Sequence, residues 1–159
     1  MYHELRKRGT SGEAGFTLLE VVCVISILAI LAAILLPALP RGTSRARLES
    51  YAVEVASLLK ADRNGALRRR IQVATEINPM MRTVRSGATG RAVAIPADVG
   101  FDAVLARRCN QRMAGPTIRF FPSGMSCGGV VKLTRLGAGY EVRVNWLTGG
   151  VEVVPINRI

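Results

Sequence analysis

One long apolar segment, residues 16–39, constrains this chain more than any other part of its sequence. As an α-helix, these 24 residues would extend about 36 Å at a rise of 1.5 Å per residue. The hydrocarbon core of a bilayer is roughly 30 Å thick, so such a helix can cross it. The segment is also longer than the roughly 7–15 apolar residues of a cleaved secretory signal. We predict a transmembrane helix over residues 16–40 and one soluble domain over residues 41–159.

A short charged leader, residues 1–15, precedes the apolar segment and ends in Gly15. Its basic residues, Arg6, Lys7 and Arg8, are typical of the charged region of an export signal. Three arginines also follow the apolar segment closely, so the positive-inside rule does not decide its orientation.

Glu20 is the one charged side chain within the apolar segment. A carboxylate at the bilayer centre costs about 2.5–3.5 kcal/mol by insertion scales, and less near the end of a span, where Glu20 lies. If the chain is cut between Gly15 and Phe16, a new ammonium group forms four positions before Glu20, on the same helix face. The carboxylate could then neutralise this ammonium or that of a neighbouring copy. The alternative is a carboxylate that only extends to the lipid headgroups.

Residues 15–20, Gly-Phe-Thr-Leu-Leu-Glu, and the apolar run after them resemble the type III signal of type IV pilins and type II secretion pseudopilins. In that family a membrane aspartyl prepilin peptidase cuts after the glycine and N-methylates the new first residue. The resemblance therefore implies cleavage between Gly15 and Phe16, N-methylation of Phe16, and a role for Glu20 in filament assembly. It also places Pro37 where the family often has a proline that kinks the helix.

A conventional secretory signal is the alternative to this processing. Its cut would fall near Ala38, and a small residue is wanted three positions before such a cut, where Leu36 stands. We therefore predict Phe16 as the first residue of the mature protein.

The histidine and cysteine content excludes the commoner catalytic and metal sites. The single histidine, His3, lies in the leader, so the mature chain cannot build a Ser-His-Asp or Cys-His arrangement. Cys23, Cys109 and Cys127 are too scattered for the usual zinc spacings, and no paired carboxylates form a motif. We predict no enzymatic activity, no cofactor and no metal site.

Cys109 and Cys127 are the only cysteines of the predicted soluble domain. If that domain is periplasmic, oxidation is permitted, and a disulfide closing this loop would add about 3 kcal/mol in the chain-entropy model. The sequence leaves their pairing open. Cys23, within the apolar segment, is expected to behave as a small hydrophobic residue.

A second helix is predicted over about residues 43–70, with Thr43 or Ser44 as its N-cap. Apolar residues recur at three- and four-residue steps from Leu48 to Leu59, which indicates one face packed on a sheet. The three arginines at 68–70 close the helix, where its dipole favours cations.

Residues 71–159 are predicted to be rich in β-strands. Apolar and polar residues alternate over residues 71–77, as in a half-buried strand, whereas most of residues 80–116 have an irregular pattern. Further strands are predicted over residues 92–95, 117–121, 130–134, 140–146 and 151–154, and residues 101–105 form a strand or a short helix. Because short glycine turns separate the last three strands, they should form an antiparallel meander. The predicted fold class is α+β.

The last forty residues carry a second set of motifs. These are residues 118–124 (IRFFPSG), the Gly-Gly pair at 128–129, the strand 140–144 and residues 146–151 (WLTGGV). Together they resemble the C-terminal region of the H-type minor pseudopilins of type II secretion. Related minor pilins of type IV pili share this domain family, but the Trp-Leu-Thr-Gly ending is closer to the secretion branch. The resemblance implies a pilin-like fold, with a long N-terminal helix against antiparallel β-sheets.

These features predict a minor pseudopilin, a structural subunit of the short periplasmic filament of type II secretion. The resemblance implies a single-pass protein of the bacterial inner membrane with its C-terminal domain in the periplasm. It also implies four partners: other pseudopilins, the prepilin peptidase, the inner-membrane assembly platform and the lipid bilayer.

The alternative is a minor type IV pilin that binds nucleic acid during DNA uptake. The net charge of +11, nearly all of it arginine, suits phosphate groups, and such binding would weaken steeply with salt. The arginines concerned are Arg68 to Arg70, Arg107, Arg108 and Arg112. In sequence no aromatic residue is interleaved with them, as a stacking surface would require, and the last residues 157–159 are only weakly basic. Arginine-rich codon usage would also explain the charge.

Overall fold

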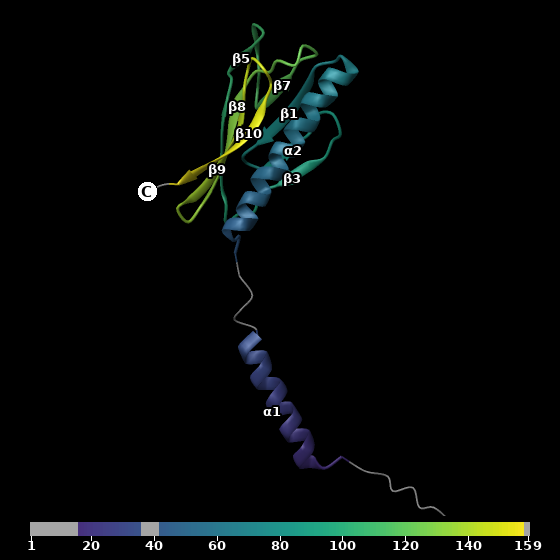
Figure 1. Ribbon diagram of the computed structural model, residues 1–159, viewed down its shortest axis with the longest axis vertical. Helices are drawn as coiled ribbons and strands as arrows, with labels where there is room; N and C mark the ends of the chain where they lie inside the picture. Colours follow the sequence, from purple (N-terminus) through teal and green to yellow (C-terminus); the bar gives the residue numbers. More distant parts are fainter. Residues whose placement is uncertain (1–15, 36–41, 158–159) are drawn as a thin grey trace, which may run out of the picture. The chain divides into compact units, whose positions relative to one another are not determined.

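A computed structural model of the protein describes residues 16–35 and 42–157 (Figure 1). The chain divides into two compact units, Met1–Pro40 and Arg41–Ile159. The predicted leader over residues 1–15, the cleavage residue Gly15 and the predicted kink at Pro37 lie outside the described residues.

The first unit contains helix α1, Leu18–Leu35, built almost entirely from aliphatic residues. It covers part of the transmembrane helix predicted over residues 16–40, and residues 36–40 are not described. In the described part of the chain, no helix is both long and apolar enough to cross a membrane.

The second unit begins with helix α2, Arg45–Arg69, which is one continuous helix of 25 residues. Ser44, one of the two predicted N-caps, accepts a hydrogen bond from the backbone N–H of Arg47 through its hydroxyl, at 3.2 Å. At the other end Arg70 adopts a left-handed backbone conformation, with φ 54°, which stops the helix. The buried face of α2 follows the periodicity that predicted the helix.

Four strands form the first sheet, in the order β3-β2-β1-β7, and every neighbouring pair is antiparallel. Their bounds are Val73–Asn78 for β1, Thr83–Arg85 for β2, Ala92–Ala94 for β3 and Thr117–Phe120 for β7. Strand β1 is therefore internal, between β2 and β7, and it carries the alternation of buried and exposed residues predicted for this part of the sequence.

The second sheet has the order β10-β9-β8-β4 and is also antiparallel. Its strands are β4 (Gly100–Leu105), β8 (Gly129–Arg135), β9 (Ala138–Val144) and β10 (Val151–Asn157). Strands β8 to β10 form the predicted meander. Pro155, which has no backbone N–H, lies in the edge strand β10, where a missing ladder bond is tolerated.

The region 80–116 contains more structure than its sequence predicted. Five strands lie in it, and β4 settles residues 101–105 as a strand. Strands β5 (Arg108–Cys109) and β6 (Arg112–Met113) form a small hairpin of their own. These strands and β2 have only two or three residues, which is too short for an alternating pattern to show in the sequence.

Helix α2 contacts both four-stranded sheets, and Figure 1 shows it lying along them. Fully buried side chains from all three layers meet in one core: Leu48, Val55 and Leu59 from α2, Ile77, Ile118 and Phe120 from the first sheet, and Val131, Leu133 and Val142 from the second. The predicted packing of an amphipathic helix on antiparallel sheets is therefore the observed arrangement of this unit.

Candidate functional site

The start of α1 holds the two described residues of the predicted signal, Phe16 and Glu20. Thr17, immediately before the helix, accepts a hydrogen bond from the Glu20 backbone N–H through its hydroxyl, at 3.2 Å. Thr17 and Glu20 thus have the spacing of a capping box, and the carboxylate lies in the first turn, where the helix dipole favours it. The backbone of Glu20 is therefore satisfied within the helix, independently of its side chain.

The Glu20 carboxylate has no such partner. Among the described residues, no hydrogen bond or salt bridge uses it. A shallow hollow on the surface of α1 is lined by Phe16, Glu20, Val21, Val24 and Ile25, so the carboxylate shares a face with the residue predicted to become the N-terminus. By contrast, the other polar group of the helix interior, the Ser26 hydroxyl, donates to the Val22 carbonyl at 2.8 Å.

A cluster around Thr43 fixes the beginning of α2. Asp98, in the loop before β4, accepts hydrogen bonds from the Thr43 backbone N–H at 2.8 Å and from its hydroxyl at 3.0 Å. Arg135, at the end of β8, pairs with the Asp98 carboxylate at 3.0 Å and also donates to the Thr43 carbonyl. The hydrogen bond from the Thr43 backbone is the main cause that lowers the pKa of Asp98 below its usual range. Desolvation opposes this effect, and the Thr43 hydroxyl and Arg135 each add a smaller lowering effect.

Asp62, near the middle of the C-terminal half of α2, is fully buried and lies on the apolar face of the helix. Its carboxylate accepts hydrogen bonds from the hydroxyls of Thr75 (2.6 Å) and Ser86 and from the backbone N–H groups of Gly87 (3.1 Å) and Ala88 (3.1 Å). These donors come from β1 and from the turn between β2 and β3, so Asp62 ties the helix to the first sheet. It is a structural residue that the sequence did not single out.

Gly87 is required in that turn by close packing. A Cβ atom at this position would lie 2.2 Å from the carbonyl oxygen of Ala74, a backbone atom that cannot move aside easily. The one sign of this cluster in the sequence is that Asp62 lies three and four positions after Leu59 and Leu58, on the apolar face of the helix. The hydrogen-bond donors to Asp62 could not be predicted, because they come from other elements far along the chain.

The structure joins Cys109 to Cys127 by a disulfide, with Cα atoms 5.5 Å apart. This bond connects β5 to the loop between β7 and β8 and so holds the small hairpin against the rest of the unit. Cys23, on α1, is a free and exposed thiol. In the part of the chain that the structure describes, no group of His, Cys, Asp or Glu residues is placed to hold a metal ion.

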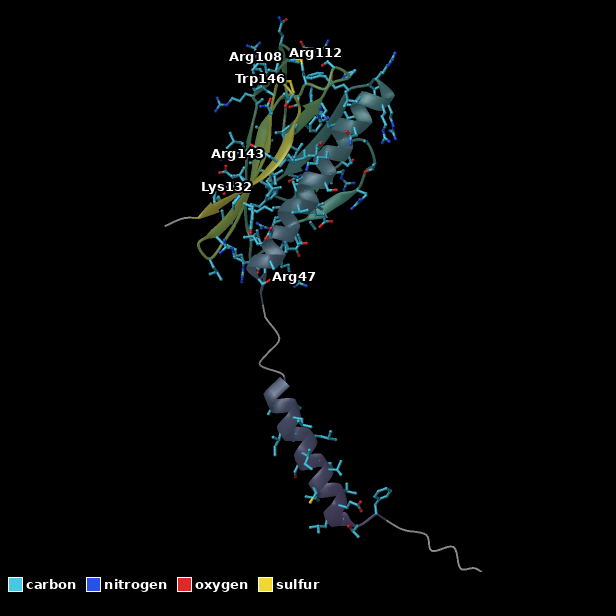
Figure 2. All side chains as sticks on the ribbon, in the orientation of Figure 1. Arg47, Arg108, Arg112, Lys132, Arg143 and Trp146 are labelled. Atoms are coloured by element: carbon cyan, nitrogen blue, oxygen red, sulfur yellow. A yellow bond between two sulfur atoms is a disulfide. The ribbon has the colours of Figure 1, made fainter. Side chains whose placement is uncertain are left out.

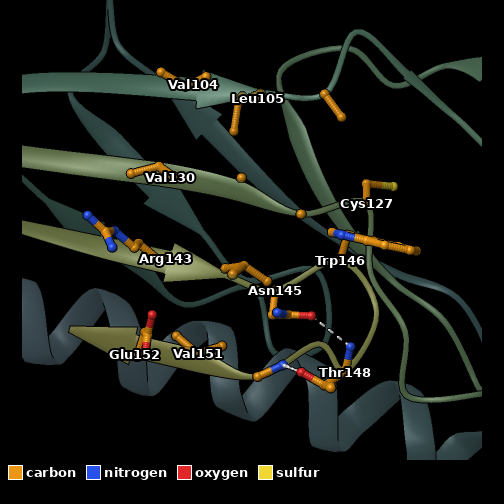
Figure 3. Close-up of a pocket in the computed structure, with 15 residues that line it drawn as sticks. Val104, Leu105, Cys127, Val130, Arg143, Asn145, Trp146, Thr148, Val151 and Glu152 are labelled. Atoms are coloured by element: carbon orange, nitrogen blue, oxygen red, sulfur yellow. Dashed lines mark hydrogen bonds between the residues drawn. The ribbon is translucent and has the colours of Figure 1, made fainter. Parts of the chain in front are cut away.

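A groove of about 870 Å³ crosses the outer face of the second sheet (Figure 3). Val104 and Val130 form its apolar floor, while Arg143 and Glu152 project from neighbouring strands. Trp146 stands beside Cys127 at one end of the groove, and 62% of its surface is exposed. Arg143 and Glu152 are the charged residues that line the groove.

Two comparisons with known sequences decide the family. Residues 10–36 match the family model described as the prokaryotic N-terminal methylation motif. Over 142 residues the chain is 30% identical to the type II secretion system protein H of Xanthomonas campestris pv. campestris, a match that covers 89% of this chain and 83% of that protein. The chain belongs to the type II secretion protein H family. It is a minor pseudopilin, and its family implies association with other pseudopilins.

Solved structures show the fold of this minor pseudopilin. The type IV minor pilin FimU of Pseudomonas aeruginosa, strain PAO1, is 17% identical, with a TM-score of 0.53, and the match covers 71% of this chain and 92% of that one. The minor pseudopilin EpsH of the Vibrio cholerae type 2 secretion system is 11% identical, with the same TM-score of 0.53, over 67% and 95% of the two chains. The predicted pilin-like α+β fold is thereby confirmed.

Proposed function

We propose that this minor pseudopilin is a structural, non-enzymatic subunit of a type II secretion pseudopilus, anchored in the inner membrane through the apolar segment that begins at Phe16. Prepilin peptidase would cut it after Gly15 and methylate Phe16, and the inner-membrane platform would then assemble it with other pseudopilins. Its globular unit, residues 41–159, would lie in the periplasm. Support comes from the methylation motif over residues 10–36 and from the similarity to protein H.

The observation that carries the proposal is the Glu20 carboxylate, which has no partner in its described surroundings and lies on a helix that is apolar on all sides. Such a helix is stable only when other apolar groups cover it, whether lipid or neighbouring helices. Within that covering a lone carboxylate is costly, and the ammonium group of an N-terminal Phe16 supplies the complementary charge. The pairing becomes available only after cleavage, which links processing to assembly.

Substitution of Glu20 separates membrane insertion from assembly. We expect Glu20→Ala to enter the membrane and be cut before Phe16 as the wild type is, since the cleavage site and the apolar helix are unchanged. Its incorporation into filaments should fall at least about tenfold, because the helix loses the charge that fixes its register against a neighbour. Fractionation, mass determination of the mature N-terminus and quantification in purified filaments measure the three steps separately.

Ser26→Ala is the matched control. It also removes a polar group from α1, but one whose hydrogen bond stays within its own helix, so incorporation should be unchanged. Normal incorporation of the Glu20 variant would refute the assembly role, and a mature N-terminus other than Phe16 would refute the processing.

A further inference from the structure

Four segments far apart in sequence meet at the end of the globular unit that is remote from the N-terminus of α2. Figure 1 shows the C-terminal end of α2 and the β5 hairpin at this same end. Two side-chain nitrogens of Arg63, on α2, donate to the Thr148 carbonyl at 3.1 and 3.0 Å, and the Ser126 backbone N–H donates to the Trp146 carbonyl at 2.9 Å. The disulfide at Cys127 adds the β5–β6 hairpin. We call this surface the distal end; it comprises residues 63–72, 106–116, 121–128 and 145–150.

The turn at Gly149 shows how tightly these segments meet. Gly149 has φ 60°, and a Cβ atom there would lie 2.3 Å from the carbonyl oxygen of Gly124 in the neighbouring loop. Gly124 in turn approaches Leu67 near the end of α2. The distal end is therefore one packed surface and not a set of independent loops.

The charge of the distal end is of one sign. Its segments contain seven arginines and no aspartate, glutamate or lysine. Six of these arginines are exposed, namely Arg68, Arg69, Arg70, Arg107, Arg108 and Arg112. The salt bridges that occur between described residues involve Lys132, Arg135 and Arg143 instead, so none of the distal arginines has a carboxylate partner there. Outside the distal end, Lys132 and Arg143 pair with Glu141, and Arg135 pairs with Asp98.

Large apolar side chains stand among these arginines. Trp146, Leu147, Ile71 and Met113 are all more than half exposed, and Met113 lies directly opposite Arg108 in the β5–β6 pair. Figure 2 shows Trp146 at the same end of the unit as Arg108 and Arg112. The sequence had suggested that no aromatic residue accompanies the arginines; the fold brings one to them from more than thirty residues away.

This composition is typical of a protein interface. Arginine, tryptophan and methionine are enriched at such interfaces and lysine is depleted, and the planar guanidinium group binds carboxylates through two hydrogen bonds at once. A nucleic-acid strand would need several aromatic faces for successive bases, and Trp146 is the only largely exposed aromatic side chain described at this end. The expected ligand is therefore a protein surface that bears carboxylates.

A second copy of the chain fits this requirement poorly. In a symmetric contact the distal arginines of both copies would face each other, and in a head-to-tail contact two chains of net charge +11 would repel each other. We propose that the distal end docks an acidic face of a different subunit of the filament. The identity of the partner as a filament subunit rests on the proposed function. The positive charge and the exposed apolar side chains of the distal end do not depend on that function.

Cross-linking in assembled filaments of the full-length chain tests this docking. A photoreactive phenylalanine replaces Leu147, whose side chain is exposed, and the adduct is identified by mass spectrometry. We expect an adduct with another pseudopilin at a surface rich in Asp and Glu. Arg108→Glu combined with Arg112→Glu should reduce its yield about tenfold, because attraction becomes repulsion. Reversing two carboxylates of the partner face to lysine should restore it.

Arg45→Glu combined with Arg47→Glu is the matched control, since it makes the same change of charge at the opposite end of α2, where Figure 2 shows Arg47. This variant should leave the adduct yield within about twofold of the wild type. A yield unaffected by the Arg108 and Arg112 reversal, a main adduct with a second copy, a nuclease-sensitive adduct with nucleic acid, or no adduct would each overturn the docking proposal. Cleavage before Phe16 and filament incorporation are measured in the same samples, so failure of the proposed function is detected separately.

Discussion

Glu20 on α1 and Asp62 on α2 are both single carboxylates on the apolar face of a helix, yet their surroundings differ completely. Asp62 accepts hydrogen bonds from four donors of its own unit and is fully buried. Glu20 has no partner for its carboxylate among the described residues and lies on the surface of its helix. Asp62 thus ties together parts of its own chain, whereas under the proposed function the partner of Glu20 lies on another subunit.

The largest effect on stability is expected at Asp62, and it would sharpen this contrast. Asp62→Ala removes the acceptor of two buried hydroxyls, those of Thr75 and Ser86, and of two partly buried backbone N–H groups. This should lower the free energy of unfolding by about 3–5 kcal/mol. Urea denaturation of the full chain in detergent micelles, followed by circular dichroism, measures the loss. Glu54→Ala, an exposed acid on the same helix, is the control and should change the free energy by no more than about 0.5 kcal/mol. If Asp62→Ala and Glu54→Ala lower the free energy of unfolding equally, Asp62 has no special role in the fold and its contrast with Glu20 fails.

A smaller effect is expected from removing one donor of the Asp62 cluster. Thr75→Val keeps the shape of the buried side chain but deletes the hydroxyl that lies 2.6 Å from the carboxylate. Because three donors remain, the free energy of unfolding should fall by only about 1–2 kcal/mol. The same denaturation experiment compares it with Asp62→Ala. If Thr75→Val lowers the free energy of unfolding as much as Asp62→Ala does, the stabilisation by Asp62 depends on the Thr75 hydroxyl alone and not on all four donors.

The smallest effect is expected at Asp98, an exposed acid that the fold also satisfies internally. Its pKa is lowered by the hydrogen bond from Thr43, so its contribution to stability is present above its unfolded pKa of about 3.9 and is lost as the pH falls through the lower folded value. The wild type should therefore exceed Asp98→Asn in urea midpoint at pH 7, and the difference should shrink below about pH 4. A difference that grows on acidification would contradict this assignment.

The sequence predicted single elements and the pairing of strands that follow one another, and it missed specific contacts between elements far apart in the chain. The signal at Phe16 and Glu20 and the meander of β8 to β10 could be predicted, because a single helix start or a run of alternating residues carries each. The role of Asp62 could not, since its donors come from β1 and the β2–β3 turn. The distal end could not be predicted for the same reason, because a disulfide and a tight turn bring Trp146 close to arginines far away in the sequence.

The strength of the local residue pattern also explains which elements could be predicted from the sequence. Strand β4 was ambiguous because Phe101 to Leu105 fit a strand and a short helix equally, and only pairing with β8 decides between them. The two-residue strands β5 and β6 have no periodicity at all and depend on the disulfide and on the turn between them. The N-cap, by contrast, was narrowed from sequence to Thr43 or Ser44; the structure assigns capping to Ser44, while Thr43 binds Asp98.

The central claim is that the partner of Glu20 lies on another subunit, and a zero-length cross-link tests it directly. A membrane-permeant carbodiimide joins a carboxylate to an amine only when the two are in contact. In assembled filaments we expect a covalent link between Glu20 and the N-terminal amine of a neighbouring pseudopilin, absent from Glu20→Gln and present in the Ser26→Ala control. A link from Glu20 to the Phe16 amine of its own chain alone, or an intersubunit link that persists in Glu20→Gln, would contradict the account.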